Sequence, residues 1–265
     1  MNQGKFVYSQ LTDFLPKRVF DCLVDKYNGN KHVRFFTCWN QILCMLFGQL
    51  TGRESMRDLM IGLDAHKSKY YHLGFGKNVT RSNLAKANEK LNYRIFEEFA
   101  YHLIKEARES SLVKDFELNI KSNVYAFDSS TIDLCLNVFW WAEFRKAKGG
   151  VKLHTLYDIK TSIPTYIYIT KASVHDVNLL DLLHYEPGRY YILDRGYIDF
   201  KRLFKIHLHS AYFVTRTKSN FRFKRIYYNK IDKESDVLFD QIGRLEGFYA
   251  LKDYPEKLRK IKYYD

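Results

Sequence analysis

The stretch that decides the fold is residues 123–134, Asn-Val-Tyr-Ala-Phe-Asp-Ser-Ser-Thr-Ile-Asp-Leu. A second stretch, residues 190–197, reads Tyr-Tyr-Ile-Leu-Asp-Arg-Gly-Tyr. In each, an apolar run of β-forming residues leads to an aspartate, Asp128 in the first and Asp194 in the second. Ionised carboxylates among such apolar neighbours are costly to bury without a counter-charge, and a divalent metal ion is the natural one. We therefore expect the two strands to lie side by side, with both aspartates facing one site.

The composition predicts a folded, strongly basic protein. The chain has 265 residues, of which 46% are hydrophobic and 17% aromatic, and 43 Lys and Arg against 30 Asp and Glu give a formal charge of +13. Such an excess favours a polyanionic partner, with nucleic acid first and a ribosomal or membrane-surface role as the alternative. The start of the sequence has no signal-peptide pattern and no run of 18 apolar residues occurs, so we expect a cytoplasmic protein without a membrane partner.

Residues 1–75 read as a small all-α domain. Apolar residues at helical spacing follow Pro16, and further helices are expected over residues 37–50 and 55–63. Three short helices are compatible with DNA binding and equally with a packing module. The sequence leaves these two interpretations open.

Residues 76–120 are expected to form linking helices. Thr80 is placed to cap a helix that runs to about Leu91, and a longer amphipathic helix follows. The basic residues of the capped helix could lie on phosphates or form a solvated face, and we take as candidate DNA contacts Arg81, Lys86 and Lys90.

From residue 121 the apolar period becomes that of strands. An antiparallel meander is expected over residues 124–132, 151–159 and 165–171. Helices and strands then alternate, with helices over 177–183 and 199–206 and strands over 190–193 and 211–216. Residues 121–216 therefore predict a mixed α/β sheet in which Asp128 and Asp194 face one site.

Residues 217–265 form a β-rich segment, and its start is basic. Cations alternate with aromatic residues between 216 and 230, where no acidic residue occurs. This pattern is typical of a nucleic-acid surface, although an ordinary two-faced strand gives it as well. The expected DNA contacts here are Arg216, Lys218, Arg222, Lys224 and Arg225.

Three further residues lie near the expected site. Arg195 follows Asp194 and could steady a phosphate or pair with a carboxylate. Lys152 lies on the polar face of its strand and is added to the expected DNA contacts. Asp176 is expected to cap the short helix that follows it.

Four motifs occur together and in order. They are Phe-Asp-Ser-Ser-Thr-Ile at 127–132, Gly-Gly-Val-Lys-Leu-His at 149–154, Ala-Ser-Val-His-Asp at 172–176 and Asp-Arg-Gly-Tyr at 194–197. This set resembles the DDE transposases of bacterial insertion sequences, of the insertion-sequence-four group. Residues 10–75 also resemble the small helical domain that precedes some of these catalytic domains.

The resemblance implies a ribonuclease H-like fold and a site that two Asp and one Glu build around two divalent ions, Mg²⁺ or Mn²⁺. The first Asp maps to Asp128 and the second to Asp194. The implied activity is metal-dependent cleavage at terminal inverted repeats, followed by attack of the freed 3′-hydroxyl on target DNA. Pairing of two transposon ends implies a homodimer on DNA, bound to the bacterial nucleoid.

The chain departs from the family at the third carboxylate. In the family this Glu lies on a helix with a Tyr, an Arg three residues later and a Glu four further, yet no Tyr of this chain has an Arg three residues later. Glu143, Glu246 and Glu256 are the remaining nearby acids, and none has that context. We therefore expect a C-terminally truncated transposase that does not catalyse alone.

Two alternatives stay open beside the truncated enzyme. One is a non-catalytic DNA-binding protein derived from a transposase, which could inhibit the intact enzyme by mixed assembly. The other is a metal-dependent nuclease of the same fold that uses other acids. Strand cleavage with a divalent ion separates the enzymes from the binding protein, and specificity for terminal repeats separates both transposase-derived proteins from the nuclease.

Overall fold

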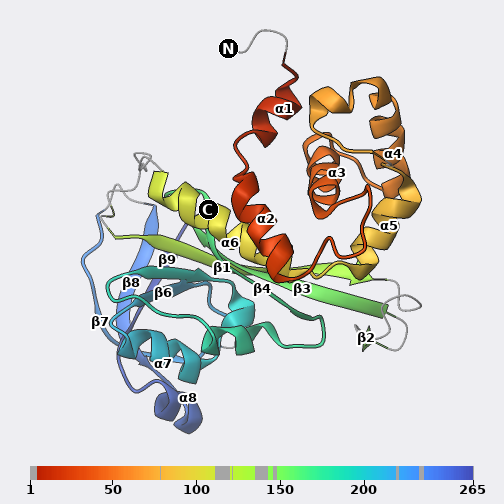
Figure 1. Cartoon of the computed structure of the whole chain (residues 1–265). Helices are drawn as coiled ribbons and strands as arrows, with labels where there is room; N and C mark the ends of the chain where they lie inside the picture. Colours follow the sequence, from red (N-terminus) through yellow and green to blue (C-terminus); the bar gives the residue numbers. More distant parts are fainter. Residues whose placement is uncertain are drawn as a thin grey trace. The chain divides into compact units, whose positions relative to one another are not determined.

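The structure, a computed structural model, describes residues 5–77, 79–110, 120, 122–134, 143–145, 148–218, 221–232 and 236–264. The chain divides into two compact units, residues 1–106 and 107–265. Figure 1 labels the helices and strands of both. In the described part of the chain, no helix has the length and apolar character that crossing a membrane requires.

The N-terminal unit is helical, as predicted. Its α-helices are α1 (Val7–Thr12), α2 (Lys17–Lys26), α3 (Cys38–Leu50), α4 (Met56–Asp64), α5 (Arg81–Lys90) and α6 (Arg94–Ser110), the last of which continues past the unit boundary. Two short 3₁₀ helices, η1 (Lys67–Lys69) and η2 (Tyr71–Leu73), connect α4 to the segment before α5. The sequence had predicted all of the α-helices except α1, which has only six residues and little amphipathic pattern.

Helix α3 is the centre of this unit because it contributes to both hydrophobic clusters. Leu43 and Phe47 pack in one cluster with α4 and α5, whereas Cys38 packs in the other with α2 and α6. A helix that is covered on two sides has apolar residues nearly all round. Side-chain caps fix where three helices begin, since the hydroxyls of Thr37, Ser55 and Thr80 each accept a hydrogen bond from the backbone amide three residues later.

The C-terminal unit contains a six-stranded mixed sheet. Its strands are β1 (Val124–Leu134), β2 (Glu143–Arg145), β3 (Lys148–Asp158), β4 (Ile163–Lys171), β5 (Tyr190–Leu193) and β6 (Tyr212–Thr215). Strands β1, β3 and β4 form the predicted antiparallel meander, and β5 and β6 add to the other side of β1 as parallel strands. This mixed sheet with a helical region before it is the arrangement expected of a ribonuclease H-like fold.

Short helices connect the parallel strands. The 3₁₀ helix η4 (Asp176–Asp181) precedes β5, the 3₁₀ turn η5 (Arg195–Tyr197) follows it, and α7 (Phe200–Leu208) leads to β6. The predicted helix over 177–183 is therefore a 3₁₀ helix. Asp199 caps α7 by accepting a hydrogen bond from the Arg202 amide at 3.0 Å.

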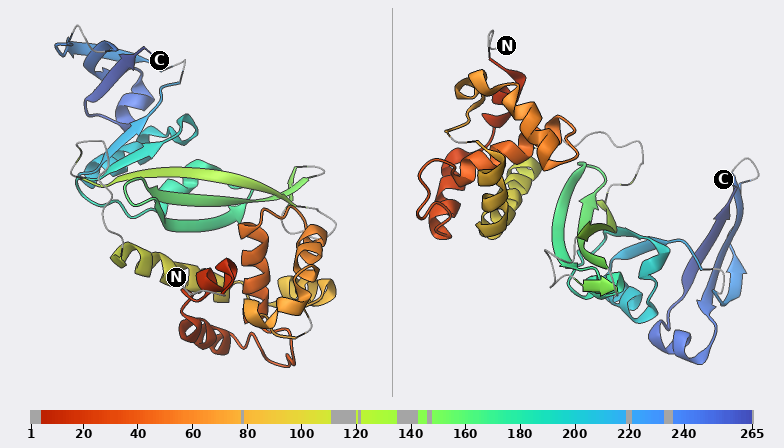
Figure 2. Two further views of the ribbon diagram at one scale, coloured as in Figure 1. Left: turned by 90° about the horizontal axis from the view of Figure 1, so that it is seen from above. Right: turned by 90° about the vertical axis from the view of Figure 1, so that its right-hand side faces the viewer.

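Residues beyond 220 form a second, three-stranded antiparallel sheet. It consists of β7 (Phe223–Tyr228), β8 (Val237–Leu245) and β9 (Leu258–Tyr263), with α8 (Phe248–Asp253) between the last two. Figure 2 shows this sheet in blue, set off from the green and cyan strands of the six-stranded sheet. The predicted β-rich segment is confirmed, and α8 is an element that the sequence did not indicate.

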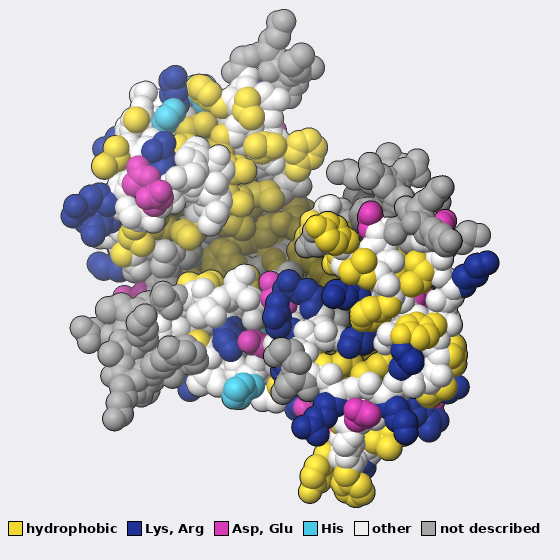
Figure 3. Space-filling view, turned by 180° about the vertical axis from the view of Figure 1, so that it is seen from behind, with side chains coloured by type: hydrophobic (Ala, Val, Ile, Leu, Met, Phe, Trp, Pro, Cys, Tyr) yellow, Lys and Arg dark blue, Asp and Glu magenta, His cyan; other side chains and the backbone are white. Residues whose placement is uncertain are grey.

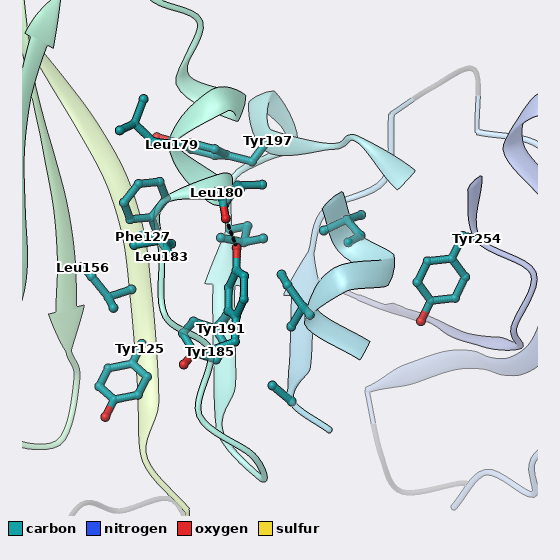
Figure 4. Packing of buried hydrophobic residues seen from close by; sticks show 14 of the residues in the cluster. Tyr125, Phe127, Leu156, Leu179, Leu180, Leu183, Tyr185, Tyr191, Tyr197 and Tyr254 are labelled. Atoms are coloured by element: carbon teal, nitrogen blue, oxygen red, sulfur yellow. Dashed lines mark hydrogen bonds between the residues drawn. The ribbon is translucent and has the colours of Figure 1, made fainter. Parts of the chain in front are cut away.

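One hydrophobic core joins the two sheets of the C-terminal unit. It is rich in tyrosine, and Figure 4 shows Tyr125, Tyr185 and Tyr191 packed together, with the Tyr185 hydroxyl donating to the Leu180 carbonyl at 2.8 Å. Tyr254 connects the three-stranded sheet to this core, since its ring meets Phe204 of α7 at 5.3 Å between centroids. A polar tip on a large apolar ring explains how so many tyrosines can be buried.

Candidate active site

The sheet register brings Asp128 and Asp194 to the same level of neighbouring parallel strands. In β1 and β5, Phe127 pairs with Leu193, so each aspartate is the next residue along its strand. The register continues into β6, where Thr215 pairs with Leu193 and is followed by Arg216. Asp128 within β1, Asp194 just after β5 and Arg216 just after β6 therefore lie at one level of three adjacent strands. This is the juxtaposition that the two quoted stretches predicted for the aspartates.

Asp194 is held at the end of β5 by hydrogen bonds and one ion pair. Its carboxylate caps η5 by accepting a hydrogen bond from the Gly196 amide at 3.4 Å. The Arg216 guanidinium lies 3.1 Å from its Oδ1. This contact with Arg216, helped by the Arg195 and Gly196 amides, holds the pKa of the Asp194 carboxyl below its usual value.

Asp128 lies within β1, whose pairing with β3 continues past the end of β5. Its side chain is exposed and its Oδ1 accepts a hydrogen bond from the Ser129 amide at 2.8 Å. Both aspartates act on a common neighbour, the buried Tyr197 of η5. Burial, together with the negative charges of Asp176, Asp128 and Asp194, raises the pKa of the Tyr197 phenol to about 12, against the lowering effect of a hydrogen bond with Ser129. The charges of all three carboxylates thus act on one phenol.

A cluster of buried side chains fixes β1 just before Asp128. The Phe127 ring lies between His154, with which it is stacked at 6.4 Å, and Tyr197, which it meets edge-on at 5.2 Å. His154 is fully buried, and its Nε2 lies 2.8 Å from the Thr170 hydroxyl. Burial lowers the pKa of the His154 imidazole, so this side chain is a neutral packing residue at neutral pH.

Lys152 and Asp176 form an ion pair beside this cluster that sequence reasoning missed. The Lys152 Nζ lies 3.0 Å from the Asp176 carboxylate and donates to the Val174 carbonyl at 2.9 Å. Asp176 is the first residue of η4 and makes no capping bond there, so its predicted capping role is wrong. The alternation of Lys152 with His154 on one strand face was the only signal of this pair in the sequence.

The expected DNA contacts fall on both units. Exposed side chains on α5 are Arg81, Lys86 and Lys90. Exposed side chains at or beyond the aspartates are Arg195, Arg216, Lys218, Arg222, Lys224 and Arg225. Lys152 differs, because its side chain is only 13% exposed and its ammonium group is held by Asp176.

The basic and aromatic residues of the three-stranded sheet contact one another. Lys260 lies over the rings of Phe221, Phe223 and Phe239, at 5.5, 5.7 and 5.8 Å from their centroids. The Arg225 guanidinium lies 4.0 Å from the centroid of the Tyr228 ring. Figure 3 shows Lys and Arg side chains next to exposed hydrophobic ones across this unit. Cations and aromatic rings together are suited to phosphates and bases.

The chemistry of the two aspartates suits a hard divalent cation, since carboxylate oxygens are the ligands that Mg²⁺ and Mn²⁺ prefer. In the described residues, no group of three or more His, Cys, Asp or Glu side chains is arranged to hold a metal ion. The Glu143 side chain lies outside the described part, and Glu246 and Glu256 flank α8. Among the described residues, Asp128 and Asp194 are therefore the two expected ligands that the register places on neighbouring strands.

Comparison with known proteins identifies the family. The family described as Transposase DDE domain matches residues 120–263, which contain both aspartates and both sheets. The chain belongs to the DDE transposase family. A second family, described as a domain of unknown function (DUF4372), matches residues 3–76, within the helical unit.

Two curated relatives agree with this assignment. A candidate transposase of Sinorhizobium fredii, y4zB, is 34% identical over 118 residues, which are 44% of this chain and 31% of the relative. A candidate transposase of the insertion sequence element IS4SA, from Synechocystis sp., is 25% identical over 228 residues, 85% of this chain and 59% of the relative. The matched region therefore spans less than two thirds of either relative. The predicted resemblance to the insertion-sequence-four group is confirmed.

Proposed function

We propose that this DDE transposase chain binds the terminal inverted repeats of an insertion sequence and takes part in cleavage and transfer of the DNA strands. The observation that carries the proposal is the sheet register, which supports Asp128 and Asp194 as a pair of metal ligands at one edge. A bound Mg²⁺ or Mn²⁺ would activate a water or a 3′-hydroxyl and stabilise the leaving oxygen of a phosphodiester. DNA is the partner that the family and the basic charge favour.

The chain's own residues have distinct roles in this proposal. Asp128 and Asp194 supply oxygen ligands, while the packing of Phe127 between His154 and Tyr197 orients the Asp128 backbone. Arg216 neutralises Asp194 before DNA binds and lies where it can take a phosphate oxygen afterwards. Arg195 and the exposed cations beyond residue 216 extend the positively charged surface that would contact a bound DNA strand.

We propose that residues 1–265 do not supply the third carboxylate, because no Tyr of this chain has the Arg three residues later that accompanies the family's Glu. Two carboxylates position a metal ion less well than three, so we expect DNA binding without efficient cleavage from the 265-residue chain. A non-catalytic DNA-binding protein is the second candidate function. The lack of a group of three metal-binding side chains among the described residues favours it. Such a protein could bind one transposon end while an intact enzyme binds the other, because two paired ends require two protein molecules.

Cleavage of DNA that carries the element's own terminal repeats, with Mg²⁺, tests the proposal. The chain would be compared with a version extended past residue 265 by the corresponding segment of the Synechocystis relative, and each with Asp128→Ala. Cleavage by the extended form alone, lost in Asp128→Ala, would support a catalytic pair that needs a third ligand. Cleavage by the 265-residue chain that survives Asp128→Ala would contradict the proposed ligands.

A further inference from the structure

The N-terminal unit contains a pocket with a volume of about 400 Å³ that no sequence motif indicated. One wall is the loop of residues 32–36, which leads into α3. The other wall is a single face of α5 and its end, formed by Asn83, Lys86, Ala87, Lys90 and Leu91. These positions recur every three or four residues, so they share one side of the helix. Ala87 and Leu91 pack partly against the two hydrophobic clusters, whereas Lys86 and Lys90 of the same side are exposed at the pocket.

Two neighbouring residues of α3 hold both walls in place. Asn40 donates a hydrogen bond to the Phe35 carbonyl at 3.1 Å and accepts one from the Gly76 amide at 2.8 Å. Gln41 donates to the Asn88 side chain of α5 at 2.6 Å. Asn40 and Gln41 are buried, so these bonds are shielded from water. The pocket is thus formed before a ligand arrives, which lowers the entropy cost of binding.

The rim of the pocket is positively charged. Four basic side chains line it and are exposed, His32, Arg34, Lys86 and Lys90, whereas no Asp or Glu lines it. Among the described residues, none of these four forms an ion pair. A cleft with charges of one sign concentrates counter-ions of the other. The rim therefore selects an anionic ligand.

The floor of the pocket is apolar and aromatic. Phe36 is buried, Phe35 is half exposed, and Ala87 and Leu91 add aliphatic surface. An aromatic floor with a cationic rim is the combination that binds single-stranded nucleic acid, by stacking on the base and pairing with the phosphates. The volume falls in the range of small-molecule sites, which suits one nucleotide and is too small for a duplex.

We propose that this pocket binds one unpaired nucleotide of a DNA strand. The base lies against Phe35, Phe36 and Leu91, and the flanking phosphates contact Lys86 and Lys90. This inference rests on DNA being the partner in the proposed function, and it adds that the strand is single or locally unpaired where the helical unit contacts it. An acidic peptide matches the rim equally well but has no planar ring for the floor.

The test is binding of the full chain to a fluorescein-labelled 12-nucleotide single strand and to the corresponding duplex, measured by anisotropy. Ala87→Trp fills the pocket without changing its charge. We expect it to weaken single-strand binding about tenfold or more, the cost of losing base stacking, and to leave duplex binding within about twofold. Arg57→Ala, an exposed cation of α4 outside the pocket, should leave single-strand binding unchanged.

A second variant keeps the test decisive if Ala87→Trp does not fold by circular dichroism. Lys86→Ala with Lys90→Ala should lower the slope of log affinity against log salt for the single strand by about 1.4, because two phosphate contacts are lost. Unchanged single-strand binding in the folded variants would overturn the pocket assignment. Displacement of the single strand by an equal concentration of octaglutamate would overturn it too, because an acidic peptide would then be the better ligand. If the unmodified chain binds the duplex but not the single strand, this inference alone is overturned. If the unmodified chain binds neither, the proposed function is overturned as well.

Discussion

At the scale of single residues, the contact between Arg216 and Asp194 matters most for the candidate site. Arg216 is 72% exposed and Asp194 is 49% exposed, so the pair is screened by solvent and adds little to stability. Its consequence is electrostatic, because the guanidinium keeps the carboxylate ionised and partly neutralised. A metal ion or a phosphate would have to compete with this contact.

Replacement of Arg216 should change the titration of Asp194. In Arg216→Ala we expect the pKa of the Asp194 carboxyl to rise towards its ordinary value, because the largest cause of its depression is lost. Carboxyl ¹³C chemical shifts followed against pH would measure this. Lys218→Ala, which removes an exposed cation two residues away, should leave the titration unchanged, and an equal effect of both variants would contradict the pairing.

Phe127→Ala tests the packing that orients Asp128. Phe127 is 2% exposed between His154 and Tyr197, so its truncation should destabilise the C-terminal unit by about 3–5 kcal/mol, the usual cost for a buried Phe. Urea unfolding would measure the loss. Phe248→Ala is the control, since that ring is 77% exposed and its loss should cost less than about 0.5 kcal/mol.

At the scale of elements, local pattern decided what could be predicted. Helix α3 was found from its apolar residues and α5 from the capping position of Thr80, and the structure adds side-chain caps at α3, α4 and α7. Strand β1 and the end of β5 were found because each joins β-forming residues to an aspartate. Helices α1 and α8 have six residues each, which is too short for a period to stand out.

Contacts between distant segments could not be predicted, because they depend on sheet register. Lys152 meets Asp176 across 24 positions of sequence, and Arg216 meets Asp194 across 22. Nothing local to either partner signals such a pair. The adjacency of the strands that carry the two aspartates is confirmed, whereas the role of Asp128 and Asp194 as metal ligands stays a prediction from the strand pattern and the family resemblance.

Asp240 of β8 and Arg259 of β9 form an ion pair between the two strands, which leads to a prediction with a pH dependence. Asp240 is buried, and its two carboxylate oxygens share the hydrogen bond from the Arg259 Nε, at 3.0 and 3.2 Å, while Oδ2 also accepts one from Nη2 at 2.7 Å. Arg259→Ala should cost about 1–3 kcal/mol, because the carboxylate loses its partner. Chemical denaturation at several pH values would measure this cost.

The sign of the pH dependence follows from the pKa of Asp240, which the hydrogen bonds from Arg259 hold below the ordinary value of 3.8. A depressed pKa stabilises the folded state above the ordinary value, and the stabilisation is lost as pH falls through the folded-state pKa. The difference in the free energy of unfolding between the unmodified chain and Arg259→Ala should therefore be largest at neutral pH and shrink below pH 3.8. A difference that grows in acid would contradict the ion pair, and Arg259→Lys should retain part of the effect.

At the scale of the whole molecule, the chain combines a helical unit with a DDE transposase domain under a common basic charge of +13. The positive charge favours DNA as the partner of both units, but the two units offer different surfaces. The helical unit offers a preformed pocket, and the three-stranded sheet offers cations that alternate with aromatic rings. The two surfaces should therefore differ in their preference for single or double strands.

The salt dependence of duplex binding measures the contribution of the three-stranded sheet. Arg222 and Lys224 alternate with partly buried Phe residues and point outward. Their joint replacement by Ala should lower the slope of log affinity against log salt by about 1.8, the value for two lost contacts with duplex phosphates. Lys252→Ala, on α8, is the control, and an unchanged slope in the double variant would contradict a DNA role for β7.

The central claim is that Asp128 and Asp194 hold a divalent ion together, and Mn²⁺ binding measured by isothermal titration calorimetry tests it most directly. Asp128→Asn and Asp194→Asn should each weaken Mn²⁺ binding by about tenfold or more, because even outer-shell changes at metal sites cost 10–100-fold. Asp236→Asn, an exposed aspartate of the same unit, should bind like the unmodified chain. Equal Mn²⁺ affinity in all three variants would contradict the shared site, whatever the chain does to DNA.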